Sequence, residues 1–246
     1  MADIYLNQAV PDVVELPKAF HAPHSALSPH NIDYASFGDN PALKRAFDAL
    51  NYVFDEANSI NEARTKPNPE HRAATHDRLI RERCDKFEPS AAEKLDSAMA
   101  GLKTELATVE SNLSTKAGLK TNPAHTNLII GTMQGFTQEK RLATVNELIE
   151  QSDGASLAAL LEVPLFTTGL TAEVRDSIKE RLYRKVDPMG FKLMEQLKLS
   201  INRMDNASMK ALPMFGELRA GTGEGEWRKR AQMAAARNAA ANASRK

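Results

Sequence analysis

The 246-residue sequence has a single cysteine, Cys84, a single tryptophan, Trp227, and only 6% aromatic residues. One cysteine excludes an intramolecular disulfide and fits a reducing compartment best. No apolar run approaches the roughly 20 residues that a membrane-spanning helix needs, and Met1-Ala2-Asp3 does not begin like a signal peptide. We therefore expect a protein without a membrane span that is made and used in the cytoplasm.

An excess of charge of one sign is also missing, because Lys plus Arg and Asp plus Glu each number 32. A balanced chain has no general field that attracts nucleic acid or anionic lipid, so any such binding must be local. The sequence contains no HExxH, GxSxG or CxxC motif, the short patterns of zinc proteases, serine hydrolases and thiol redox proteins. These absences favour a non-enzymatic protein that needs no cofactor and no metal.

Helix-forming residues are plentiful, since Ala, Leu, Lys and Glu dominate the composition. The clearest helical signal is a seam of aliphatic residues spaced alternately by four and three positions: Leu95, Met99, Leu102, Leu106, Val109 and Leu113. Ser90 and Glu93 have the spacing of a capping box, which predicts the start of this helix, and Gly118 predicts its end.

A second seam, formed by Met194, Leu197, Ile201 and Met204, repeats the same spacing and is the natural partner of the first. An intrachain hairpin or bundle is the preferred interpretation. A coiled coil between two chains is the alternative, because the spacing alone does not distinguish the two.

The remaining helix boundaries follow from capping residues and prolines. Asn40-Pro41 predicts a helix start, the stretch 66–69 predicts a break, and a polar helix is expected from there to about Lys86. Further boundaries are predicted at Thr137, Asp153-Gly154, Thr171, Asp187-Pro188 and Pro213. The apolar piece 128–130 is compatible with a short strand or a helical turn.

Residues 1–40 differ from the rest of the chain because prolines at 11, 17, 23, 29 and 41 prevent a long helix. We expect an extended arm that carries enough apolar surface to bind a neighbouring subunit or the chain's own body. The residues assigned to this contact are Val10, Val13, Val14, Leu16 and Phe20.

Residues 214–246 are expected to form a glycine joint, at Gly221, Gly223 and Gly225, followed by an Ala-rich basic tail that contains no acid after Glu226. Trp227 at the start of the tail is assigned to subunit binding. Basic residues beside an aromatic ring can also follow a nucleic-acid backbone, and a solvated helix end is the simpler alternative. The candidate nucleic-acid contacts are Arg228, Lys229, Arg230, Arg237, Arg245 and Lys246.

Two local patterns resemble reactive or ligand-binding groups. Cys84 has basic neighbours that would lower a thiol pKa, but it shares an apolar helix face with Ile80 and Phe87, which favours a buried structural role. The histidines at 21, 24 and 30 lack a recognisable set of metal ligands, and His71 and His76 are expected at the surface.

A helix-turn-helix was also considered for residues 156–185. The helix that follows carries Arg175, Lys179, Arg181, Arg184 and Lys185. The turn from 163 to 171 is too long for this motif, and Glu173 and Asp176 would face the phosphates. Glu180 and Arg184 are instead expected to form an ion pair on the helix surface.

The stretch 161–173, LEVPLFTTGLTAE, resembles a segment of small helical proteins encoded by tailed bacteriophages. This resemblance implies a virion or assembly role and transfers no functional residue. The sequence as a whole predicts an all-α chain: an elongated helical bundle over 41–213, preceded by the arm and followed by the joint and tail. We expect a structural subunit of an assembly that binds itself or other structural subunits, and a nucleic-acid-binding module is the alternative.

Overall fold

The computed structural model describes residues 37, 39–65, 73–120 and 122–219. Within these ranges the regular elements are all α-helices, which confirms the predicted all-α class. In chain order they are α2 (Pro41–Thr65), α3 (Ala73–Lys116), α4 (Pro123–Gln134), α5 (Gln138–Gln151), α6 (Gly154–Glu162), α7 (Leu165–Thr168), α8 (Ala172–Val186) and α9 (Pro188–Arg219).

The chain divides into two compact units. Unit 1 comprises the residues up to Leu102 together with those from Ser200 onward, and unit 2 is Lys103–Leu199. The boundary falls within α3 and α9, so each of these helices contributes one segment to each unit.

Most of the predicted helix ends are present with the capping contacts that their residues suggest. The Asn40 side chain accepts hydrogen bonds from the backbone N–H groups of Ala42 and Leu43, both at 3.1 Å. Thr137 and Thr171 cap α5 and α8 in the same way. Gly118 adopts a left-handed φ of +64°, the conformation that glycine accepts most readily after a helix. The undecided piece 128–130 is helical and belongs to α4.

Two predicted helix boundaries are wrong, because α3 continues through Pro89 and α9 continues through Pro213 to Arg219. A proline inside a helix removes one backbone hydrogen bond. In α3 the loss is outweighed by a buried face that runs on both sides of the proline: Ile80, Cys84, Phe87, Ala91, Leu95, Ala98 and Leu102. In α9 the buried residues Met214, Phe215 and Leu218 follow Pro213.

The predicted capping box at Ser90 and Glu93 is therefore absent, because Ser90 lies inside α3. Its Oγ lies 3.0 Å from the hydroxyl of Tyr52 on α2. The hydroxyl connects two helices instead of capping one.

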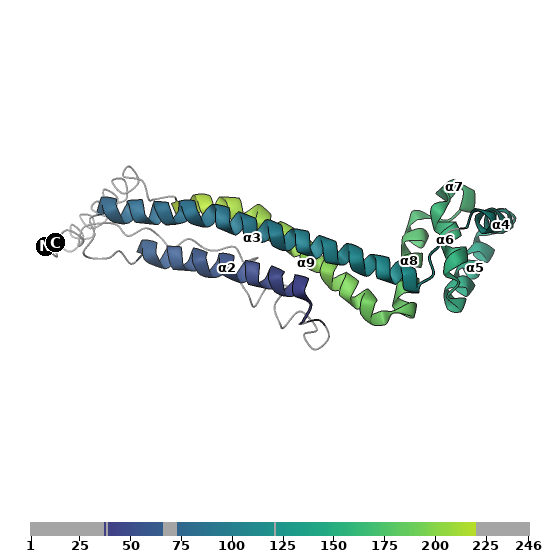
Figure 1. Ribbon diagram of the computed structural model, residues 1–246. Helices are drawn as coiled ribbons and strands as arrows, with labels where there is room; N and C mark the ends of the chain where they lie inside the picture. The colour runs from purple at the N-terminus through teal and green to yellow at the C-terminus, as the bar shows by residue number, and fades with distance from the viewer. Residues whose placement is uncertain (1–36, 38, 66–72, 121, 220–246) are drawn as a thin grey trace, which may run out of the picture. The chain divides into compact units, whose positions relative to one another are not determined.

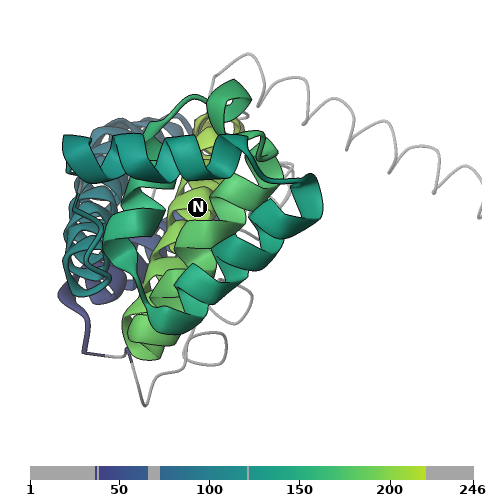
Figure 2. The same ribbon diagram turned by 90° about the vertical axis from the view of Figure 1, so that its right-hand side faces the viewer.

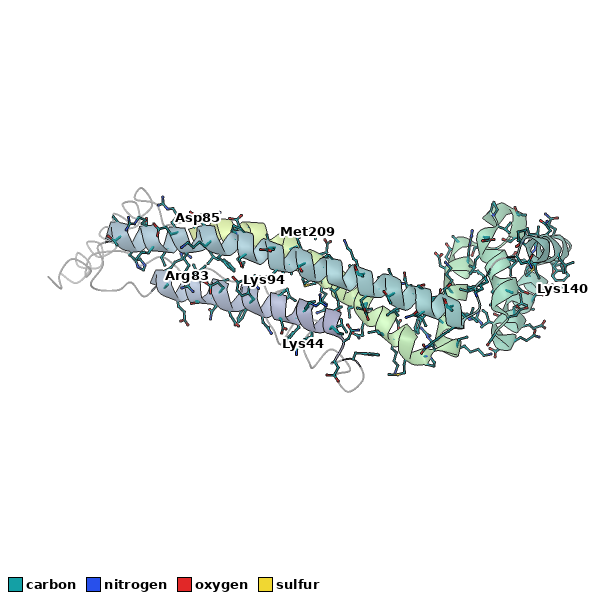
Figure 3. The ribbon with its side chains drawn as sticks, in the orientation of Figure 1. Lys44, Arg83, Asp85, Lys94, Lys140 and Met209 are labelled. Atoms are coloured by element: carbon teal, nitrogen blue, oxygen red, sulfur yellow. The ribbon has the colours of Figure 1, made fainter. Side chains whose placement is uncertain are left out.

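Unit 1 is built from α2, the N-terminal segment of α3 and the C-terminal segment of α9. The ring of Phe87 meets that of Phe215 edge to face at 5.2 Å between centroids. Figure 3 places Arg83 and Lys94 on the side of α3 that faces α2, where Arg83 forms an ion pair with Glu56 at 2.8 Å. Aromatic packing and ion pairs thus connect all three helices.

Unit 2 contains the C-terminal segment of α3, the N-terminal segment of α9 and the short helices α4 to α8, which cross one another at steep angles (Figure 2). Lys116 at the end of α3 forms an ion pair with Asp187 at the start of α9, at 2.5 Å, and Glu110 pairs with Lys198 at 3.0 Å. Of the first predicted seam, Val109 and Leu113 are buried in this unit, and Leu95 and Leu102 are buried in unit 1. The segments of α3 and α9 thus make antiparallel contacts within one chain.

Candidate functional site

The residues assigned from the sequence to subunit and nucleic-acid binding lie outside the described residues. They are Val10, Val13, Val14, Leu16 and Phe20 of the arm, and Trp227, Arg228, Lys229, Arg230, Arg237, Arg245 and Lys246 of the tail. The histidines at 21, 24, 30 and 71 and the glycine joint are likewise outside. A candidate site must therefore be built from other side chains.

A depression with a strongly charged lining lies in unit 2 and is called here the charged cleft. It has a volume of about 350 Å³. Helix α8 supplies most of its wall, and α3, α6 and α9 supply the rest. Its lining residues are Glu110, Leu161, Arg175, Asp176, Lys179, Glu180, Tyr183, Met194 and Lys198.

The inner part of the charged cleft is apolar and firmly packed. Tyr183 is 7% exposed and Met194 is buried. Burial raises the pKa of the Tyr183 hydroxyl, and a hydrogen bond with the Ser114 side chain partly offsets this effect. Tyr183 therefore stays neutral at physiological pH and contributes a rigid surface rather than a charge.

The cations in the C-terminal half of α8 contact groups of their own chain. Arg181 donates to the Asn146 side chain at 2.9 Å, and Lys185 forms an ion pair with Glu150 at 2.8 Å. The hydrogen bond from Lys185 lowers the pKa of Glu150. These contacts fasten α8 to α5 and leave the two cations poorly placed for a nucleic-acid backbone.

The predicted ion pair between Glu180 and Arg184 is absent from the ion pairs of the described residues. The guanidinium of Arg184 instead lies over the ring of Phe191 at 4.7 Å. The attraction between a cation and an aromatic ring holds the Arg184 side chain against Phe191 instead of against the Glu180 carboxylate.

The N-terminal half of α8 behaves differently. Arg175, Asp176, Lys179 and Glu180 line the charged cleft, and no ion pair of the described chain involves any of them. Arg175 and Lys179 are four positions apart, as are Asp176 and Glu180. Like charges at this spacing repel each other on a helix surface, whereas the opposite charges of Asp176 and Lys179, three positions apart, attract each other weakly.

A second depression, in unit 1, lies between α2 and α3 and has a volume of about 420 Å³. Its wall contains Tyr52, whose hydroxyl contacts Ser90 and whose ring lies 4.7 Å from the Lys94 ammonium. Arg45, Asp48 and Glu93 complete a polar lining without net charge. Because Tyr52 already contacts Ser90 and Lys94, this groove has fewer polar groups available to bind a ligand than the charged cleft.

The reactive groups considered from the sequence are buried inside unit 1. Cys84 is 3% exposed, and burial raises the pKa of its thiol despite the nearby charges of Arg219 and Arg64. A thiol with a raised pKa is a poor nucleophile, and the expectation that Cys84 is buried together with Ile80 and Phe87 is confirmed.

His76 was expected at the surface and is instead buried, at 6% exposure. Unit 1 also buries other polar residues, among them Arg64, whose guanidinium donates to Asn61 at 3.3 Å. Within the described ranges no group of histidine, cysteine and carboxylate side chains has the geometry of a metal site. None of the helices in these ranges is long and apolar enough to cross a membrane.

The described residues thus form an all-α fold with a charged cleft in unit 2. Comparison with known proteins finds no family model, no curated protein and no solved structure that matches the chain.

Proposed function

We propose that the chain is a structural subunit of a multi-protein assembly, with a helical-bundle body that presents surfaces for neighbouring subunits. The observation that carries this proposal is the antiparallel contact of α3 with α9, made through Phe87 and Phe215 in unit 1 and through Lys116 and Asp187 in unit 2. Most residues of the two apolar seams are buried within the chain and are not available for other proteins: Leu95, Leu102, Val109, Leu113, Met194, Leu197 and Met204. Partners must then bind elsewhere.

The partner surfaces in this proposal are the arm, through Val10, Val13, Val14, Leu16 and Phe20, and the tail, through Trp227. Apolar residues on a proline-punctuated segment can lie along a neighbouring subunit without a folded core of their own. A bacteriophage virion is the proposed assembly, on the strength of the resemblance over residues 161–173. In the fold this stretch includes α7 and reaches the first turn of α8.

The test is co-expression of the full chain with the structural genes that flank its own gene, followed by gradient purification of the assembled particles. The chain should sediment with the particles in a fixed copy number, and deleting residues 1–36 should reduce that number. Particles that assemble normally and never contain the chain would refute the proposal.

The alternative is a nucleic-acid-binding module that uses the basic tail, and it rests on the run of six cations without an acid after Glu226. Its affinity should fall steeply with salt, by about 0.9 log units per log unit of salt for each phosphate neutralised. Binding to a duplex that is unchanged when residues 227–246 are deleted would exclude this role for the tail.

A further inference from the structure

When α8 is read in reverse, the sign of the charge changes at each of four positions. Reading from the N-terminus, the charges that line the cleft are positive at Arg175, negative at Asp176, positive at Lys179 and negative at Glu180. Reading the same positions backwards gives the opposite sign at each place. A second copy of this helix, laid antiparallel, therefore presents a complementary charge pattern.

We propose that α8 of one chain pairs antiparallel with α8 of a second copy, across a two-fold axis that passes between positions 177 and 178. In this register Arg175 faces Glu180 of the partner subunit, and Asp176 faces Lys179 of the partner subunit. Both pairs have the same midpoint along the helix, so a single axis places all four cations opposite carboxylates. A two-fold contact of this kind uses the same surface on both copies.

The four charged side chains share one face of α8. At about 100° per residue, the four side chains fall within roughly 140° of the helix surface, so they share one face. All four also line the charged cleft, as expected for side chains on one helix face. Glu110 and Lys198 at the same cleft neutralise each other at 3.0 Å, so they add no net charge that would repel a second copy.

The energetic reason is the opposite charge that the partner helix brings to each of the four side chains. None of them belongs to an ion pair of the described residues, and within one helix the attraction of Asp176 for Lys179, three positions apart, is weak. Exposed ion pairs are individually weak and are screened by salt, so the dimer should be weak and should dissociate as ionic strength rises.

This inference deepens the proposed function, since a repeated subunit contacts copies of itself, but it is tested separately. Sedimentation velocity of the full chain at several concentrations should show a monomer–dimer equilibrium at low salt. The acidic variant, Arg175→Glu with Lys179→Glu, and the basic variant, Asp176→Lys with Glu180→Lys, should each weaken self-association by about tenfold or more, because like charges now face each other. Mixing the two variants should restore a dimer, since an all-acidic helix then faces an all-basic one.

The matched control is Lys120→Glu with Lys192→Glu, which changes the charge by the same amount as the acidic variant at exposed positions of unit 2 outside the cleft. It should associate like the wild type. Circular dichroism checks that every variant is folded, and Arg175→Gln with Lys179→Gln replaces the acidic variant if that one unfolds.

A wild-type chain that stays monomeric over the whole concentration range would overturn the inference. So would folded variants that associate as strongly as the wild type, or a mixture that does not form a heterodimer. If the chain enters particles normally but does not dimerise through α8, the proposed function stands and this inference is wrong. If the chain dimerises through α8 but never enters particles, the inference stands and the proposed function is wrong.

Discussion

Asp187 should contribute measurably to stability, because its single side chain serves two helices. One carboxylate oxygen accepts from the backbone N–H of Gly190 at 2.8 Å and caps α9, and the other accepts from the Lys116 ammonium at the end of α3. Its side chain is 19% exposed, whereas that of Lys116 is 59% exposed. The cap is therefore the larger contribution, and solvent weakens the ion pair.

The expected magnitudes follow from these two contacts. Asp187→Ala removes both and should lower the free energy of unfolding by about 1–2 kcal/mol, as the loss of a helix N-cap typically does. Asp187→Asn keeps an oxygen that can accept from Gly190 and should lose only about 0.3–1 kcal/mol, the contribution of a partly exposed charge pair near a helix N-terminus. Urea unfolding followed by circular dichroism at neutral pH measures both, and Lys116→Gln reports the ion pair alone.

The stability that Asp187 contributes should also depend on pH, with a known sign. The hydrogen bond from Lys116, followed by that from Gly190, holds the pKa of the Asp187 carboxyl below its usual value. The ionised carboxylate therefore stabilises the fold at pH values above the pKa that Asp187 has in the unfolded chain. This stabilisation is lost as the pH falls through the lower pKa that Asp187 has in the folded chain. The difference between wild type and Asp187→Asn should shrink over this acidic range. Equal stabilities of the Asn and Ala variants, or an Ala variant as stable as wild type, would refute the assignment.

Three further substitutions and one thiol-labelling experiment test the packing. Gly154→Ala would place a Cβ 1.7 Å from the Ala117 carbonyl oxygen and should destabilise unit 2 by more than about 2 kcal/mol. Gly131→Ala meets nothing within 4 Å and should stabilise α4 by about 0.5–1 kcal/mol. A stabilised Gly154→Ala or a destabilised Gly131→Ala in the same urea assay would contradict this. Cys84 should react with a thiol reagent only at the rate of unfolding, and rapid labelling of the native chain would show that it is accessible. Pro89→Ala should raise the unfolding free energy by about 1–3 kcal/mol, since it restores a backbone donor inside α3, and a loss of stability would indicate that the proline itself is needed there.

Helix starts were predictable because they depend on a few adjacent residues. Asn40, Thr137 and Thr171 each carry an acceptor that can reach the free N–H groups of the first turn, and each does so. The predicted boundaries between Lys86 and Ser90 and at Pro213 were wrong because local signals, the capping-box spacing and the penalty of a proline, were given more weight than burial further along the helix. The spacing of Ile80 to Leu102, which continues unchanged across Pro89, was the signal that could have corrected this.

The candidate site was much less predictable than the helices. The charged cleft brings together residues from α3, α6, α8 and α9, and no spacing along the chain indicates which of them meet. The burial of His76 depended on the tertiary packing of unit 1 in the same way. What the sequence did contain was the alternation of charges at 175, 176, 179 and 180, which was weighed there only as a nucleic-acid contact.

The central claim is that α3 and α9 pair within one chain and leave partner binding to other surfaces. It is tested most directly by crosslinking Glu110→Cys to Lys198→Cys in a Cys84→Ala background, since the native side chains of this pair are 3.0 Å apart. Asn112→Cys with Lys198→Cys is the control, because position 112 is exposed about 200° around α3 from position 110. The account predicts a rapid crosslink within the monomer, at a rate independent of protein concentration and much faster than in the control. Crosslinks that form only between chains, at a rate proportional to concentration, would contradict it.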